Sequence, residues 1–163
     1  MSTTNRHRSQ SGFSLIELLI VVGIILVIAA IAIPELMSAR MSANESAAVT
    51  NSRSIVTSEL AYSVEYNVGF STSLGQLGGT GVTPSAANAL LIDSVLAAGT
   101  KTGYQFVYAV TATDANGFPV GFSINANPIA HNLTGRRYFY SDQVGAIYMN
   151  YNASAGPTDP PLQ

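Results

Sequence analysis

The sequence contains no cysteine and few charged residues. Without cysteine the chain has no disulfide, no thiol nucleophile, no cysteine-ligated zinc and no haem attached through a Cys-x-x-Cys-His motif. Charged residues make up 10% of the 163 residues, against about a quarter in a typical soluble domain. So low a charge suits a chain that is surrounded by copies of itself. The length leaves room for one domain besides any membrane segment.

Recognisable sites for metals and nucleotides are also missing. The two histidines, His7 and His131, lie outside any spaced cluster of carboxylates, so we expect no metal site and no cofactor. The glycine-rich segment 75–81 lacks the lysine and the following serine or threonine of a phosphate-binding loop, and we interpret it as a connection. Asp142 and Asp159 could ligate calcium, but no tightly spaced acidic loop surrounds them. Solvated turns are therefore the preferred interpretation for both.

An apolar run from Phe13 to Ile33 dominates the amino-terminal part of the chain. Its 21 residues would form a helix of about 31 Å, close to the thickness of a bilayer's hydrocarbon core. Arg6 and Arg8 precede the run, and no basic residue follows it until Arg40. The positive-inside bias therefore predicts a single-pass membrane helix whose amino terminus is cytoplasmic.

Glu17 is the only strongly polar residue inside this run. A charge at such a depth costs about 3 kcal/mol or more unless it is paired, so a carboxylate there is a functional hypothesis. The alternative is a simple membrane anchor, in which the Glu17 side chain reaches the headgroups from near the helix end. The functional interpretation requires a partner for the carboxylate.

The start of the run resembles the processing and assembly signature of type IV prepilins and of the pseudopilins of type II secretion, over residues 12–22 (GFSLIELLIVV). In that family a prepilin peptidase cuts after the glycine, and the same enzyme methylates the new amino-terminal residue. The resemblance implies cleavage between Gly12 and Phe13, N-methylation of Phe13, and an assembly role for Glu17 as the fifth mature residue. Pro34 lies where the family has its helix-interrupting proline.

The resemblance also implies partners and a location. Family members polymerise through the amino-terminal helix into a filament of identical subunits, with an inner-membrane assembly platform and an assembly ATPase. The free amine of a neighbouring subunit's Phe13, exposed only after cleavage, is then the candidate partner for Glu17. We expect the chain in the bacterial inner membrane before assembly, and in an extracellular pilus or a periplasmic pseudopilus afterwards. Loss of residues 1–12 leaves a formal charge of about −4, which gives no reason to expect nucleic-acid binding.

Beyond Pro34 the pattern predicts that the helix continues over residues 35–66. This part is expected to be amphipathic and to pack on a small domain. The apolar residues predicted to share its packed face are Val49, Val56, Leu60 and Val64. Because Pro34 removes one backbone donor and crowds the preceding turn, we expect a kink there.

The remaining segments predict a small antiparallel sheet. Alternation indicates a strand over residues 104–111 and a return strand over 118–124, joined by the turn 114–117. A second pair covers residues 137–140 and 146–151. The prediction is an α+β fold in which three or four antiparallel strands pack on one long helix. The pilin family implies the same fold.

A short surface helix is predicted over residues 88–98, with Gly99 as its stop. Since the sequence has no cysteine, it also lacks the disulfide that closes the carboxyl-terminal loop in many pilins. The predicted organisation is a removable leader peptide (1–12), a transmembrane and filament-core helix (13–34), an amphipathic spine (35–66), a connecting region with a short helix (67–103), an antiparallel sheet (104–152) and a flexible tail (153–163).

Three functions fit these observations. The first is a structural subunit of a type IV pilus-like filament, and the second is a pseudopilin of a type II secretion system. The third is a membrane-anchored periplasmic enzyme or binding module. No constellation of nucleophile, base and orienting group supports catalysis, so we expect no enzyme activity. Between the first two, the missing calcium-type loop favours a pilin and the missing disulfide favours a pseudopilin.

Overall fold

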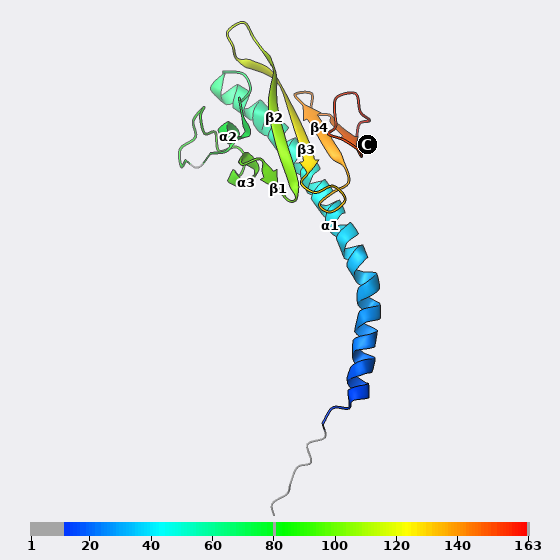
Figure 1. Cartoon of the computed structure of the whole chain (residues 1–163). Helices are drawn as coiled ribbons and strands as arrows, with labels where there is room; N and C mark the ends of the chain where they lie inside the picture. Colours follow the sequence, from blue (N-terminus) through cyan, green and yellow to red (C-terminus); the bar gives the residue numbers. More distant parts are fainter. Residues whose placement is uncertain (1–11, 80, 163) are drawn as a thin grey trace, which may run out of the picture. The chain divides into compact units, whose positions relative to one another are not determined.

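The computed structural model describes residues 12–79 and 81–162. The predicted leader therefore lies outside the described residues, except for Gly12. The fold is α+β, with one long helix followed by an antiparallel sheet (Figure 1). The elements follow the order α1 (Leu15–Tyr66), α2 (Leu74–Leu77), α3 (Ser94–Ala97), β1 (Thr100–Lys101), β2 (Tyr104–Thr113), β3 (Pro119–Pro128), β4 (Tyr138–Asp142) and β5 (Ile147–Asn150).

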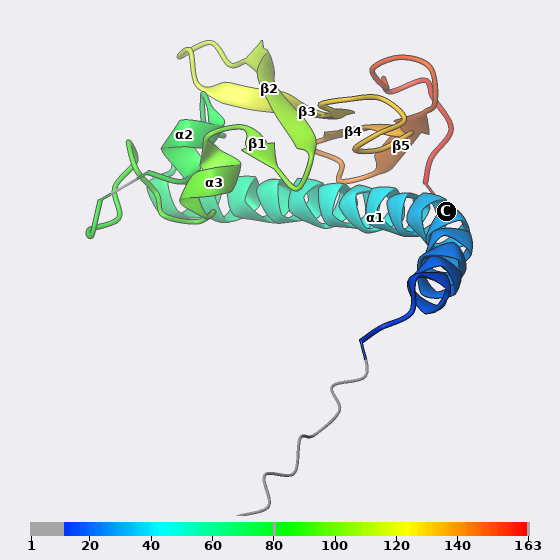
Figure 2. The same cartoon turned by 60° about the horizontal axis from the view of Figure 1, so that its bottom comes forward.

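The chain divides into two compact units between Met37 and Ser38, and α1 contributes to both. The first unit contains the apolar part of α1. The second contains the remainder of α1, the two short helices and the sheet. Within the second unit, the sheet lies along one side of α1 (Figure 2). Pro34 lies inside α1, whose helical conformation is unbroken from Leu15 to Tyr66. The kink at Pro34 stays a prediction.

In the second unit, the buried positions of α1 recur every three or four residues, as expected for one face of a helix. They include Met41, Glu45, Ala48, Ser52, Ile55, Glu59 and Tyr62. Val49 and Val56 are also buried, but Leu60 and Val64 are 50% and 83% exposed, so their predicted place on the packed face is wrong. The predicted pattern failed because polar side chains occupy part of the packed face and are hydrogen-bonded there.

The sheet has five antiparallel strands in the order β1-β2-β3-β4-β5. This is one more than the upper predicted number, because β1 has only two residues and is too short to show alternation. The longest pair is the hairpin of β2 and β3. Its turn is held by Asp114, whose carboxylate accepts hydrogen bonds from the backbone amides of Asn116 and Phe118 at 2.9 and 2.8 Å.

Aromatic side chains from the sheet fill the core against α1. Alternate residues of β2, starting with Tyr104 and Phe106, point inward, as the period of a strand requires. Phe122 of β3 stacks on Tyr108 with ring centroids 5.7 Å apart and meets the edge of Phe70 at 4.9 Å. Most of the tyrosines and phenylalanines of the sheet therefore serve packing.

The predicted helix over residues 88–98 is shorter than expected. Only Ser94–Ala97 is helical, and the Asp93 side chain caps it by accepting from the amides of Val95 and Leu96. Leu90 has a positive φ of 56°, which a right-handed helix does not allow. The segment before α3 instead donates backbone hydrogen bonds to α2 and its flanks, as in Ala89 N to the Gln76 carbonyl at 2.8 Å.

The carboxyl-terminal segment, predicted to be a flexible tail over 153–163, is paired along β5. The amide of Met149 donates to the Pro160 carbonyl at 3.0 Å, and the amide of Leu162 donates to the Ile147 carbonyl at 2.7 Å. The Asp159 carboxylate accepts from the Asn150 side chain at 3.0 Å and from the Gly156 amide at 2.8 Å. These contacts fix the segment without a disulfide, and they correct the predicted flexibility.

A buried carboxylate ties α1 to the connection that follows it. Glu59 is fully buried and accepts hydrogen bonds from the Ser71 amide at 2.8 Å and from the Ser71 hydroxyl. The Tyr108 hydroxyl donates to the Ser71 carbonyl at 2.8 Å. Burial raises the pKa of Glu59 and outweighs the hydrogen bonds from Ser71, which lower it. Burial, followed by the nearby Glu59 charge, raises the pKa of Tyr108.

Replacement of Glu59 by glutamine should reduce the pH dependence of stability. Because the folded pKa lies above the ordinary value of 4.5, this group's stabilisation is complete below that pH and is lost as the pH rises through the folded pKa. Glu59→Gln cannot titrate, and its amide can accept from the Ser71 amide and donate to the Ser71 hydroxyl. Its free energy of unfolding should therefore vary less than that of wild type between about pH 4.5 and pH 7.

The measurement is urea unfolding of the full chain in detergent, followed by tyrosine fluorescence, since the chain has no tryptophan. Glu65→Gln, an exposed carboxylate of the same helix, is the control and should keep the wild-type slope. An unchanged slope in Glu59→Gln would contradict the raised pKa.

Removal of the Asp159 carboxylate should release the carboxyl-terminal segment. Asp159→Ala leaves the Asn150 amide and the Gly156 N–H without their acceptor, at a cost of about 1 to 3 kcal/mol. Hydrogen exchange at the Met149 and Leu162 amides should accelerate. Asp142→Ala is the matched control, since Asp142 accepts within an exposed turn from the Val144 amide. If both amides were equally protected from exchange in wild type and in Asp159→Ala, this role of Asp159 would be contradicted.

Candidate processing and assembly site

The predicted cleavage junction lies outside the helix. Residues Gly12, Phe13 and Ser14 have no regular secondary structure, and α1 begins at Leu15. The Phe13 side chain is 82% exposed, and no atom outside the immediate chain neighbours lies within 4 Å of a Cβ built on Gly12. The peptide bond between Gly12 and Phe13 is therefore accessible to a peptidase in a non-helical segment.

Ser14 is a residue of this site that sequence reasoning missed. Its carbonyl accepts a hydrogen bond from the Leu18 amide at 3.2 Å, so Ser14 occupies the position where the helix begins. Serine followed three residues later by glutamate is the capping-box pattern of a helix amino terminus. Ser14 and Glu17 have this spacing, so the sequence did contain a signal by which Ser14 could have been found.

Glu17 lies in the first turn of α1 and is exposed. An acidic group is favoured at this end of a helix, where unpaired backbone N–H groups concentrate positive charge. The ion pairs of the described residues join Lys101 to Asp93 and Arg137 to Glu45, so Glu17 has no charged partner among them. The Glu17 carboxylate is thus exposed and unpaired within the part of the chain that the structure describes.

The surface around Glu17 is almost entirely apolar. An 18-residue window of α1 has a mean hydropathy of 3.2 and none of its residues is buried. This is the single helix among the described residues with the length and composition to cross a membrane. The bulky apolar side chains from Leu15 to Ile33 are mostly more than half exposed, and an exposed apolar surface of this size marks a site of contact with a membrane or with protein.

The other candidate residues lie elsewhere. Pro34 follows the apolar run inside α1, on the first compact unit. Asp142 closes a turn by accepting from the Val144 amide, and Asp159 clamps the carboxyl-terminal segment. No group of three or more histidine, cysteine, aspartate or glutamate side chains in the described ranges is placed to hold a metal ion.

Comparison with protein families identifies this amino-terminal region. The prokaryotic N-terminal methylation motif matches residues 7–33. The match contains Gly12, Phe13 and Glu17 and ends one residue before Pro34. No curated protein and no solved structure matches the chain significantly.

The chain therefore carries the signature of type IV prepilins and pseudopilins. Its fold has the pilin-like arrangement of a long amino-terminal helix packed on an antiparallel sheet. The motif and the exposed apolar helix support a subunit of the pilin or pseudopilin type. They are consistent with anchoring in the inner membrane, and the motif implies processing by a prepilin peptidase.

Mass spectrometry of the protein from its native host tests the site. The mature chain should begin at Phe13 and carry one additional methyl group on its amine. A chain that still begins at Met1 or Ser2 in assembled material would contradict the assignment. Gly12→Val is the useful variant, because it places a branched side chain at the junction, and it should accumulate uncleaved and membrane-bound.

Proposed function

We propose that the chain is a structural subunit of a type IV pilus-like filament, which polymerises through its amino-terminal helix after removal of the leader. One observation carries the proposal. The exposed apolar part of α1 presents a single carboxylate, Glu17, in its first turn and four residues after Phe13, the predicted first residue of the mature chain. A membrane anchor requires only the apolar surface, whereas assembly accounts for the carboxylate as well.

Cleavage creates a positively charged partner for the Glu17 carboxylate. Hydrolysis between Gly12 and Phe13 creates a free α-amine, which remains positively charged after a single methylation. In a bundle of identical helices, this amine from an incoming subunit pairs with the Glu17 carboxylate of its neighbour. An uncleaved chain has no amine there, so processing has to precede assembly.

The proposal extends to partners and location. The subunit is inserted in the inner membrane with its amino terminus in the cytoplasm, where a prepilin peptidase processes and methylates it. An assembly platform and its ATPase then add it to a homopolymeric filament outside the membrane. We propose a structural and not a catalytic role. The groups with raised pKa values support this role, because Glu59 and Tyr108 are engaged in fixing the segment after α1.

Substitution of Glu17 separates insertion from assembly. Glu17→Val should insert and be cleaved at least as well as wild type, because it removes a charge from the apolar run. Filament formation should fail or slow greatly, since the incoming amine is then buried without a partner at a cost of about 3 to 5 kcal/mol. Glu17→Gln tests whether charge is needed, and Glu65→Gln is the control on the same helix.

The readout is the number and length of filaments sheared from cells and examined by electron microscopy. Filaments of wild-type length in Glu17→Val would show that the pairing account is wrong. Recovery of the wild-type chain in the sheared surface fraction supports a pilus. Recovery only in periplasmic assemblies with secretion-pathway components would favour the pseudopilin alternative.

A further inference from the structure

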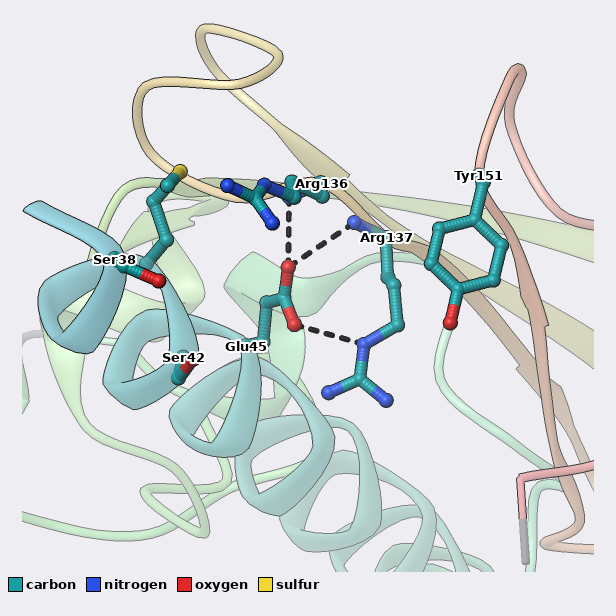
Figure 3. A pocket seen from close by; sticks show the side chains of 7 residues that line it. Ser38, Ser42, Glu45, Arg136, Arg137 and Tyr151 are labelled. Carbon is teal, nitrogen blue, oxygen red and sulfur yellow. Dashed lines mark hydrogen bonds and ion pairs between the residues drawn. The ribbon is translucent and has the colours of Figure 1, made fainter. Parts of the chain in front are cut away.

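A polar pocket opens beside the first turns of α1 in the second unit (Figure 3). Its volume is about 170 Å³, which is several times the share of one liquid water, about 30 Å³. It can therefore hold a group of the size of a phosphate. The side chains that give it its chemistry are Ser38, Ser42, Glu45, Arg136, Arg137 and Tyr151.

The Glu45 carboxylate holds the backbone and one arginine side chain of this pocket in place. It is buried and accepts hydrogen bonds from the Arg136 amide at 2.7 Å, the Arg137 amide at 3.2 Å and the Arg137 Nε at 2.8 Å. Both carboxylate oxygens are thus engaged within the chain. The Arg137 guanidinium also lies over the Phe139 ring, 5.5 Å from its centroid. These contacts fix the Arg137 side chain in one orientation.

The pocket has a surplus of positive charge and of hydrogen-bond donors. The lining contains one carboxylate and two guanidinium groups, and Figure 3 shows the two arginine side chains on either side of Glu45. Arg136 forms no ion pair with another described residue. The hydroxyls of Ser38, Ser42 and Tyr151 likewise make no hydrogen bond within the described ranges. The arrangement suits a planar or tetrahedral oxyanion.

The position along α1 indicates where such an anion comes from. Ser38 and Ser42 follow Ile33, the last residue of the apolar run, by five and nine residues on one continuous helix. At about 1.5 Å per helical residue, five and nine residues correspond to about 8 and 14 Å of chain. The headgroup layer of a bilayer begins where the hydrocarbon core ends and is about 5 to 8 Å deep. So short a connection keeps Ser38 and Ser42 close to the headgroup layer when the apolar run spans the hydrocarbon core.

We propose that this pocket binds the phosphate of an anionic phospholipid while the subunit resides in the membrane before polymerisation. The inference rests on the proposed function in one respect, which is that the subunit waits in the membrane as a monomer. The bound phosphodiester is held by Arg136 and by the hydroxyls of the pocket, and Arg137, which is paired with Glu45, adds positive charge to the site. Release of the lipid then accompanies extraction of the subunit from the membrane.

The test uses the full chain in detergent, with dioctanoyl-phosphatidylglycerol as the lipid probe. Dioctanoylglycerol, which has the same acyl chains and no phosphate, is the control ligand, and inorganic phosphate is the third probe. Native mass spectrometry gives the dissociation constants. Phosphatidylglycerol should bind more tightly than dioctanoylglycerol, and inorganic phosphate should compete with it.

Arg136→Gln should weaken phosphatidylglycerol binding by roughly tenfold, the usual effect of losing one charge-assisted hydrogen bond. This variant keeps the backbone amide that Glu45 accepts from, so the fold is preserved. Arg53→Gln, an exposed arginine of α1 outside the pocket, should bind as wild type. Ser42→Ala together with Tyr151→Phe removes two hydroxyl donors and leaves both arginines in place. It should weaken binding less than Arg136→Gln does.

Equal affinities for phosphatidylglycerol and dioctanoylglycerol, or equal affinities of wild type and Arg136→Gln for phosphatidylglycerol, would overturn the proposal. If inorganic phosphate binds in an Arg136-dependent way and phosphatidylglycerol does not, the lipid assignment is wrong and the source is soluble phosphate. Binding is measured on detergent-solubilised monomers. A failure to bind lipid can therefore be distinguished from a failure of filament assembly, which is measured with the Glu17 variants.

Discussion

The second unit depends on two buried carboxylates that project from one face of α1. Glu45 accepts from the backbone and side chain of the segment before β4, and Glu59 accepts from Ser71 in the segment after α1. They are 14 residues apart on the helix, which is close to four turns at 3.6 residues per turn. The two side chains therefore point the same way, and a single straight helix fixes the position of two segments distant in sequence.

The glutamates of α1 lie in two contrasting environments. Glu45 and Glu59 are buried, and each accepts two or more hydrogen bonds from within the chain. Glu17 is exposed in the apolar part and has no charged partner among the described residues. A carboxylate that loses its water needs such compensation, because an unpaired charge in an apolar environment costs several kcal/mol. The folded unit supplies that compensation internally, whereas the described residues of the apolar part supply none.

Much of the fold followed from the sequence where the pattern was local. Alternation predicted the hairpin of β2 and β3, and the apolar run predicted the first half of α1. Long-range polar contacts left no such signal: Glu45 and Arg137 are 92 residues apart in the chain. Polar burial of this kind also explains why Leu60 and Val64 were wrongly predicted to be packed. At the candidate site, the motif indicated Gly12, Phe13 and Glu17, whereas Ser14 was missed.

The edge of the sheet at β5 is covered by another segment of the chain. The outer edge of β5 carries the carboxyl-terminal segment, in which Pro160 and Pro161 lack the N–H groups needed to extend the hydrogen-bond ladder. At the other edge, β1 is only two residues long and pairs with Tyr104 and Gln105, so it covers only the start of the ten-residue β2. Short, charged or covered edges prevent sheets from joining each other. In the proposed filament, crowded subunits would therefore meet along the β5 edge through side chains and not through added strands.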